Sequence, residues 1–259
     1  MKSVAAAMGA AMVVAGLSGC GHSATHELDH AQQVLATCPP NDQKLAALVT
    51  SDESGTRRGS TAEPAQQEVI RKAVERTAIC GGHFRLSLFA GGVVTAGVYD
   101  GDLKLEGATE TARLRKAPKV IDTTMAAING ALPSALERLD GGQTDIVGQL
   151  QPAQQYRDQL SANGQHYQLD LSELTDGIET AQVDLSDPAL SSAQAEQLAT
   201  TVSVPDLSGA RVRVIGVGRK ADGEQLPTPY VEALRAFHLA VCTRTRATTC
   251  VAVTDAAGA

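Results

Sequence analysis

The sequence predicts an α/β fold in which a doubly wound, mostly parallel sheet is flanked by helices. Short apolar runs of strand length alternate with longer stretches of helical periodicity. Several of the apolar runs end in loops rich in aspartate, threonine and glycine. The chain has 259 residues, enough for one domain with a sizeable core. Ligands of such sheets bind beyond the carboxyl ends of the strands, so the chemistry is expected in those loops.

Apolar runs bounded by turn residues mark five strands. The run "LAALVT" has the continuous apolar character of a strand buried on both faces, and "HYQLDLSEL" alternates between apolar and polar positions. The Asp100-Gly101 pair is a typical turn signal, so we expect the second hairpin strand to turn there. The predicted strands are 44–50, 83–92, 93–107, 166–177 and 210–218.

Five segments have the periodicity of amphipathic helices. Pro64 and the acidic residues after it are typical of a helix start. Pro133 removes a backbone donor, so we expect it to divide the long helix in which it lies. The predicted helices are 64–79, 117–140, 146–163, 191–199 and 229–242.

The first twenty residues predict export. Lys2 precedes an apolar run that is too short to span a bilayer comfortably, and small residues follow it. The tetrapeptide Leu17-Ser18-Gly19-Cys20 resembles the lipobox of bacterial lipoproteins, which implies lipidation of Cys20. The alternative is an ordinary secretory signal with an incidental cysteine. We therefore expect a signal peptide at 1–19, a lipid-anchored tether at 20–37, and a body on the extracytoplasmic face of the bacterial cell membrane.

The tether contains "HELDH" (26–30), which matches the H-E-x-x-H motif of zinc proteases. That motif requires a buried helix over a cleft and a third ligand further along the chain. Here it begins six residues after Cys20, where no core is expected to surround it. His22, His26 and His30 share a spacing of four and would chelate a metal only weakly, so a solvated tether is the preferred interpretation.

Composition excludes several classes of partner. The formal net charge is −7, and it becomes −8 once Lys2 leaves with the signal. An acidic body disfavours nucleic acid and anionic lipid as the main partner. The chain has no tryptophan and few aromatic residues, which disfavours a carbohydrate-stacking platform.

Four further cysteines, Cys38, Cys80, Cys242 and Cys250, are expected to form two disulfides in an exported chain. Their number allows three pairings. A metal–thiolate site is the alternative, but no C-x-x-C spacing supports it.

Oxygen-bearing side chains gather in three of the predicted strand-end loops. Hard oxygen ligands of this kind suit Mg²⁺, with Ca²⁺ or Mn²⁺ as alternatives, and disfavour zinc or copper. Two carboxylates alone leave a cation undercharged, so it would retain waters and accept another anionic oxygen. The five candidate ligands are Asp52, Ser54 and Thr56 in "SDESGT", Thr144 in "GGQTD", and Asp176 in "LTDG".

These three loops, in this order, resemble the von Willebrand factor type A (VWA) domain family, a three-layer, Rossmann-like fold. "DESGT" fits the D-x-S-x-S/T motif of that family, and the resemblance covers 38–250, leaving a tail at 251–259. It implies a metal-ion-dependent adhesion site (MIDAS), in which a carboxylate of a protein ligand completes the coordination of the cation. The resemblance also implies the disulfides Cys38–Cys80 and Cys242–Cys250. Two features depart from the family pattern: a polar fourth strand, and Glu53, whose charge would compete for the cation or repel an acidic ligand.

The preferred function is therefore a membrane-anchored module that binds a protein ligand through a divalent cation, without catalysis. An envelope-scaffolding lipoprotein with a non-functional metal site is the first alternative. A metal-dependent hydrolase is the second. A serine hydrolase is disfavoured, because no G-x-S-x-G motif is present and Ser54 has no evident histidine partner.

Overall fold

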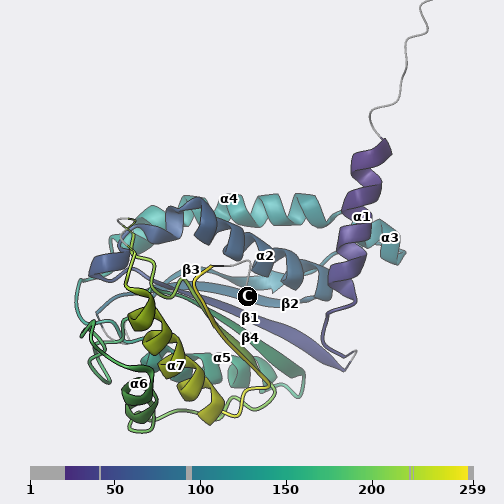
Figure 1. Ribbon diagram of the computed structural model, residues 1–259. Helices are drawn as coiled ribbons and strands as arrows, with labels where there is room; N and C mark the ends of the chain where they lie inside the picture. Colours follow the sequence, from purple (N-terminus) through teal and green to yellow (C-terminus); the bar gives the residue numbers. More distant parts are fainter. Residues whose placement is uncertain (1–20, 41, 92–94, 222, 224, 256–259) are drawn as a thin grey trace, which may run out of the picture.

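The computed structural model describes residues 21–40, 42–91, 95–221, 223 and 225–255. Six strands form one sheet in the order β3-β2-β1-β4-β5-β6 (Figure 1). Every neighbouring pair is parallel except β2–β3. The mostly parallel α/β sheet predicted from the sequence is thus confirmed. The strands are β1 (Gln43–Asp52), β2 (Gly82–Phe89), β3 (Thr95–Leu103), β4 (His166–Leu174), β5 (Arg211–Ile215) and β6 (Thr249–Val253).

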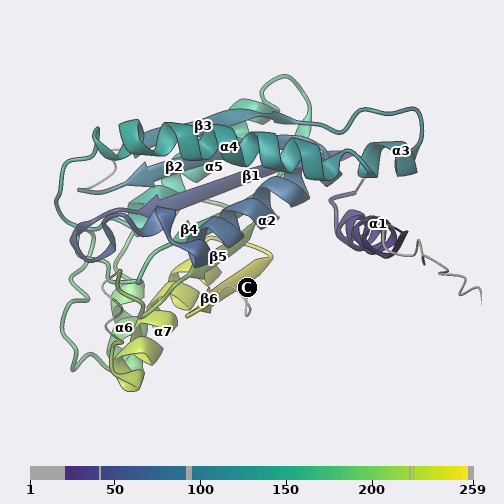
Figure 2. The ribbon, with the colours of Figure 1, turned by 90° about the horizontal axis from the view of Figure 1, so that it is seen from above.

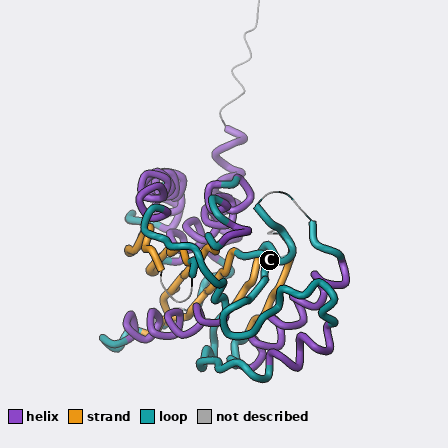
Figure 3. The backbone as a smooth tube through the Cα atoms, turned by 90° about the vertical axis from the view of Figure 1, so that its left-hand side faces the viewer, coloured by secondary structure: helices purple, strands orange, loops and turns teal. Residues whose placement is uncertain are grey.

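Helices cover both faces of this sheet. Figure 1 shows α2 and α4 on one face and α5, α6 and α7 on the other, and Figure 3 shows the layers from the side. The short helix α3 and the N-terminal helix α1 lie at one end of the first face (Figure 2). The helices are α1 (Gly21–Leu35), α2 (Pro64–Cys80), α3 (Glu110–Leu114), α4 (Ala117–Leu136), α5 (Leu150–Ser161), α6 (Ser192–Ala199) and α7 (Thr228–Arg244).

The sheet divides the apolar interior into two cores. Along β1, Leu45 and Val49 face the core under α2 and α4, whereas Ala46 and Leu48 face the core under α5 and α7. Successive side chains of a strand point to opposite faces, so a strand with helices on both sides must be apolar at every position. This explains the unbroken apolar run of "LAALV".

β4 is central although its sequence is polar. It pairs with β1 and β5, and its residue Asp170 is only 4% exposed. Arg76 and Arg213 lie 3.2 and 2.6 Å from the Asp170 carboxylate. A buried carboxylate is tolerated in this central strand because two arginines pair with it.

Three local predictions were wrong. β3 continues through Asp100-Gly101 without turning, because Asp100 pairs with Arg85 in the β2–β3 ladder. Pro133 lies in the last turn of α4 and does not divide the helix; its carbonyl still accepts from the Glu137 N–H at 3.2 Å. β6 extends beyond Cys250, so 251–253 belong to the sheet and not to a tail.

Both implied disulfides are present. Cys38–Cys80 joins the segment after α1 to the end of α2, and Cys242–Cys250 joins α7 to β6. The tether is partly helical and packs on the body, since Ala31 of α1 is 4% exposed. His30 of the "HELDH" segment is half exposed and lies 3.2 Å from Glu75. Cys20 and the signal segment fall outside the described residues, among which no helix has the length and apolar character to cross a membrane.

Candidate metal centre

The five predicted ligands meet where the strand order reverses. β1 is followed by β2 on one side and has β4 on the other, which makes the carboxyl ends of β1 and β4 a topological switch point. Asp52 is the last residue of β1, and Asp176 follows β4 by two residues. Thr144 reaches the same edge from the loop before α5. We call Asp52, Ser54, Thr56, Thr144 and Asp176 the oxygen cluster.

Hydrogen bonds connect the members of the oxygen cluster. The Thr144 hydroxyl donates to Ser54 Oγ at 2.7 Å. The Thr56 hydroxyl donates to Asp176 Oδ2 at 2.7 Å. The backbone N–H of Ser54 donates to Asp52 Oδ1 at 2.9 Å. Residues far apart in the sequence thus present their oxygens to one another within a few ångströms.

The loop after β1 is shaped by its own backbone. The Ser54 N–H bond to Asp52 forms an Asx-type turn, in which the aspartate side chain substitutes for a backbone acceptor. The Arg57 N–H then donates to the Ser54 carbonyl at 2.7 Å and begins a short 3₁₀ turn, Gly55–Arg57. This turn presents the Ser54 and Thr56 hydroxyls at the edge of the sheet.

The loop after β4 is fixed around Asp176. Its Oδ1 accepts from the Ile178 N–H at 3.0 Å, and its carbonyl accepts from the Gly218 N–H at 2.8 Å. Gly177 has a φ of 83°, and a Cβ there would approach Val217 to 3.2 Å, so only glycine fits without strain. Burial lowers the pKa of His238 to about 4, so its neutral ring donates from Nε2 to the Gly177 carbonyl at 2.9 Å.

The Thr144 loop is joined to the same region. Thr144 and Thr180 exchange two bonds: the Thr144 N–H donates to Thr180 Oγ1 at 2.8 Å, and the Thr180 N–H donates to the Thr144 carbonyl at 2.9 Å. The fully buried Glu179 accepts from the Val147 N–H at 2.9 Å and from the Ala181 N–H at 2.8 Å. These contacts hold Thr144 at a defined distance from β1.

Both aspartates of the cluster are almost wholly buried, Asp52 at 0% and Asp176 at 1% exposed. Burial, and then the charge of Asp176, raise the pKa of Asp52 to about 6 despite bonds from Ser54 and Thr175. Burial likewise raises the pKa of Asp176, against the bonds from Thr56 and Ile178 and the charges of Arg57 and Lys220. A bound cation would stabilise the ionised forms of these two neighbouring carboxylates.

The donor set fits a hard divalent cation. All five side chains offer oxygen, and Thr56 is exposed, so the cluster opens to solvent there. Neighbouring ligands of an octahedral Mg²⁺ at about 2.1 Å would lie roughly 3.0 Å apart. Oxygen pairs already at 2.7 Å therefore need little movement to share a cation. Within the described part of the chain no group of three or more histidine, cysteine, aspartate or glutamate residues is placed to hold a metal.

Glu53 does not behave as the sequence suggested. Its carboxylate turns away from the oxygen cluster and accepts from the Thr61 N–H at 3.0 Å, the Thr61 hydroxyl and the Gly59 N–H. Glu53 is 1% exposed and fixes the loop that leads to α2. The expectation that it competes for the cation is therefore corrected, because both of its carboxylate oxygens accept hydrogen bonds within the loop.

Sequence reasoning missed one close neighbour of the cluster. The Thr175 hydroxyl donates to Asp52 Oδ2 at 2.8 Å from the end of β4. Its position directly before Asp176 was a signal that could have identified it, because a residue at the end of the neighbouring parallel strand faces the same edge.

Known proteins similar to this chain are found among solved structures. No protein-family model and no curated protein matches the chain. Among solved structures, an aerotolerance-related membrane protein from Bacteroides fragilis is 12% identical with a TM-score of 0.42, covering 81% of this chain and 90% of that one. The ArnB paralog VWA2 from Sulfolobus acidocaldarius is 12% identical with a TM-score of 0.37, covering 82% of this chain and 42% of that one. A von Willebrand factor type A protein from Catenulispora acidiphila is 13% identical with a TM-score of 0.28, covering 76% and 43%.

The chain thus spans less than half the length of two of these three proteins. With every TM-score below 0.5, the similarities support no conclusion about function, which has to come from the site itself. Two of these three proteins carry the VWA name, and the third is named as an aerotolerance-related membrane protein.

Proposed function

We propose that this chain is a lipid-anchored, extracytoplasmic binding protein whose VWA-like domain takes a protein ligand through a divalent cation at the oxygen cluster. Cys20 would carry the lipid, and the body would lie on the extracytoplasmic face of the bacterial cell membrane. Mg²⁺ is the preferred cation, with Ca²⁺ or Mn²⁺ as alternatives. The domain would bind without catalysing a reaction.

One observation carries the proposal. Five oxygen-bearing side chains, chosen from three separate stretches of sequence, meet at one switch point in hydrogen-bonded contact. Their two buried carboxylates repel each other, and burial makes each harder to ionise. Ionising both carboxylates is unfavourable without a cation and favourable with one, as expected for an open metal site.

A bound cation would supply a positive charge to which a carboxylate of the partner could be attracted. The two aspartates provide at most two negative charges, so the cation would keep affinity for another anionic oxygen. The exposed Thr56 marks the side from which a ligand would approach. Neutralising the acidic group of the partner would therefore weaken binding.

Thermal unfolding in the presence of cations tests the proposal. Unfolding is followed by circular dichroism, because the chain contains no tryptophan. A cation at a hundred times its Kd stabilises the fold by about 2.7 kcal/mol. For a domain of this size that corresponds to a rise in Tm of roughly 5–10 °C. EDTA should abolish the rise, and Asp52→Ala should show none.

The exposed Asp102 provides a matched control, since Asp102→Ala removes a carboxylate far along the sheet from the cluster. This variant should respond to cations as the unaltered chain does. An unaltered chain that gains no stability from Mg²⁺, Ca²⁺ or Mn²⁺ would refute the metal-dependent function and favour the scaffolding alternative.

A further inference from the structure

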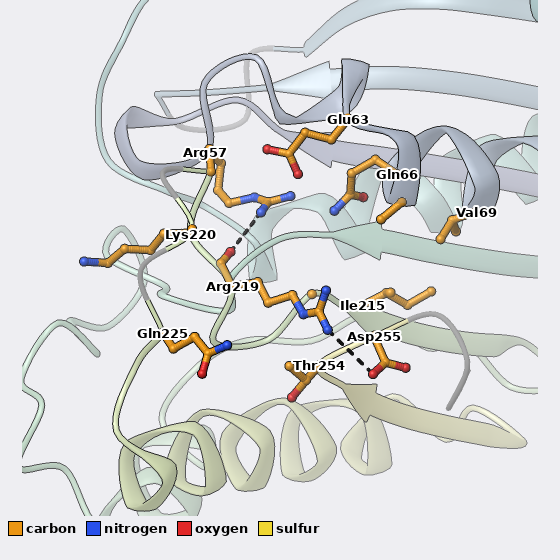
Figure 4. Close-up of a pocket in the computed structure, with 14 residues that line it drawn as sticks. Arg57, Glu63, Gln66, Val69, Ile215, Arg219, Lys220, Gln225, Thr254 and Asp255 are labelled. Carbon is orange, nitrogen blue, oxygen red and sulfur yellow. Dashed lines mark hydrogen bonds and ion pairs between the residues drawn. The ribbon is translucent and has the colours of Figure 1, made fainter.

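A cavity lies beside the oxygen cluster, between the start of α2 and the ends of β5 and β6 (Figure 4). Its volume is about 360 Å³, within the range of small-molecule sites. It shares no lining residue with the oxygen cluster. Its lining side chains include three cationic ones and two acidic ones: Arg57, Arg219, Lys220, Glu63 and Asp255.

Arg57 is the unusual member of this lining. It is 1% exposed, and only its Nη1 has a partner, the Arg219 carbonyl at 2.8 Å. Its Nε and Nη2 donate to no group of the described chain. Figure 4 shows the guanidinium pointing into the space between Glu63, Gln66 and Arg219. Burying a guanidinium with two unpaired N–H donors costs free energy unless a bound ligand accepts hydrogen bonds from them.

Gln66 is a second incomplete group on the same wall. It lies in the first turn of α2, is 7% exposed, and its Oε1 has no hydrogen-bond partner in the described chain. The first backbone N–H groups of a helix also lack intrahelical acceptors, and they add positive potential at this end of α2. Two buried polar side chains on one wall of the cavity therefore have atoms without hydrogen-bond partners in the described chain.

The chemistry of the wall specifies the ligand. Nε and Nη2 are adjacent donors on one edge of the guanidinium, and a planar carboxylate accepts from such an edge with both oxygens. Glu63 and Asp255 would oppose a group that carries two charges, such as phosphate, more strongly than a carboxylate group, which carries one. Asp255 is paired with Arg219 at 3.7 Å, and Arg57, which is in no described ion pair, acts through its charge on the buried Asp176.

We propose that this cavity binds a carboxylate group on the Nε/Nη2 edge of Arg57, independently of the cation. The carboxylate belongs to a small organic acid or to the end of a peptide. Both sources present the same planar, singly charged group to Arg57.

Titration of the purified chain with sodium acetate and sodium succinate in EDTA tests this proposal. Sodium chloride at matched ionic strength and inorganic phosphate serve as reference anions. Acetate or succinate should raise Tm saturably, by at least 2 °C more than chloride or phosphate. Arg57→Met should lose this response, whereas Arg58→Met, which removes an exposed neighbouring charge, should keep it. An equal rise with all anions, or an unaltered response in Arg57→Met, would overturn the proposal.

A second variant covers the case in which Arg57→Met does not fold. Arg219 is half exposed, so Arg219→Met should fold, and its affinity for the carboxylate should fall at least threefold. An unchanged affinity there would contradict the proposed site. Tetra-alanine with a free terminus and its amidated form identify the source: binding of only the free form shows that a peptide end suffices, and binding of acetate or succinate alone points to a small acid.

Failure of this proposal and failure of the metal-dependent function remain distinguishable. Asp52→Ala should lose the cation response and keep the carboxylate response, because EDTA is present throughout the carboxylate titration. Arg57→Met should lose the carboxylate response in EDTA, whatever its effect on the cation response through Asp176.

Discussion

The Thr175 hydroxyl donates to Oδ2 of Asp52 at 2.8 Å, and both residues are fully buried. Thr175 Oγ1 also accepts from the Gly177 N–H at 3.1 Å, so its proton is left to point at the carboxylate. Asp52 Oδ1 is held by the Ser54 N–H at 2.9 Å. The end of β4 thereby fixes the orientation of the carboxylate at the end of β1.

Thr175→Val should weaken cation binding without touching a proposed ligand. It keeps the shape of the side chain and removes a bond that lowers the pKa of Asp52, so the carboxylate becomes harder to ionise. Loss of a supporting partner of this kind typically weakens metal affinity by about 10–100-fold. Titrating the cation-induced rise in Tm measures the effect. Thr175→Ser should restore most of the affinity, and a Val variant with native affinity would show that Thr175 does not position Asp52.

Glu173 makes the stability of the fold depend on pH. It is 2% exposed, and burial and then the charge of Glu179 raise its pKa to about 8. Because its pKa in the folded chain exceeds the unfolded value of 4.5, its contribution is complete below 4.5 and is lost as the pH rises through about 8. Glu173→Gln mimics the protonated form, so its free energy of unfolding should decline less between pH 5 and pH 9.

Denaturant unfolding at pH 5, 7 and 9 measures this difference. The exposed Glu196 provides the matched control, and Glu196→Gln should follow the pH dependence of the unaltered chain. Parallel pH profiles for Glu173→Gln and the unaltered chain would show that Glu173 is ionised in the fold.

Local sequence signals were sufficient for most of the architecture. The run 44–50 predicted β1, since a strand between two helical layers must be apolar on both faces. They failed where a tertiary contact decided the outcome. Asp100-Gly101 has the chemistry of a turn, but pairing of Asp100 with Arg85 keeps β3 extended. β6 is only five residues long and partly exposed, so it carries too little apolar pattern to be recognised.

The meeting of the five oxygen-bearing side chains was predictable from the sequence, but the contacts that hold them in place were not. Asp52, Ser54 and Thr56 occur within one short motif, and Thr144 and Asp176 lie in recognisable loops. Thr180 and Glu179 act through contacts between loops that no spacing reveals, and the only signal for Thr175 was its position directly before Asp176. Glu53 was misjudged for the same reason: its sequence position suggests the cation, whereas its partners Gly59 and Thr61 lie in the following loop.

Glu53→Gln should destabilise the fold and leave cation affinity within about twofold of the native value. The buried carboxylate accepts from the Thr61 and Gly59 N–H groups, and a neutral amide oxygen accepts such bonds less strongly. Weakening these bonds should cost about 1–3 kcal/mol of unfolding free energy. Chemical denaturation and a cation titration measure the two quantities separately. A marked change in affinity with unchanged stability would restore Glu53 as a participant in the cation site.

The two disulfides should differ in their contribution to stability. Cys38–Cys80 closes a sequence separation of 42 residues, and Cys242–Cys250 one of 8. A longer loop loses more chain entropy in the unfolded state, so removing the first should cost about 4 kcal/mol and removing the second about 2.5 kcal/mol. Paired Cys→Ala variants, compared by denaturant unfolding, measure both values.

Neither disulfide variant should alter the response to cations. Cys38 and Cys80 lie next to the amino ends of β1 and β2, and Cys250 lies near the amino end of β6, whereas the oxygen cluster lies at the carboxyl ends of β1 and β4. Loss of either bridge therefore lowers Tm with and without the cation by the same amount. A cation-induced rise that shrinks when a bridge is removed would instead mean that the bridge helps to hold the oxygen cluster in place.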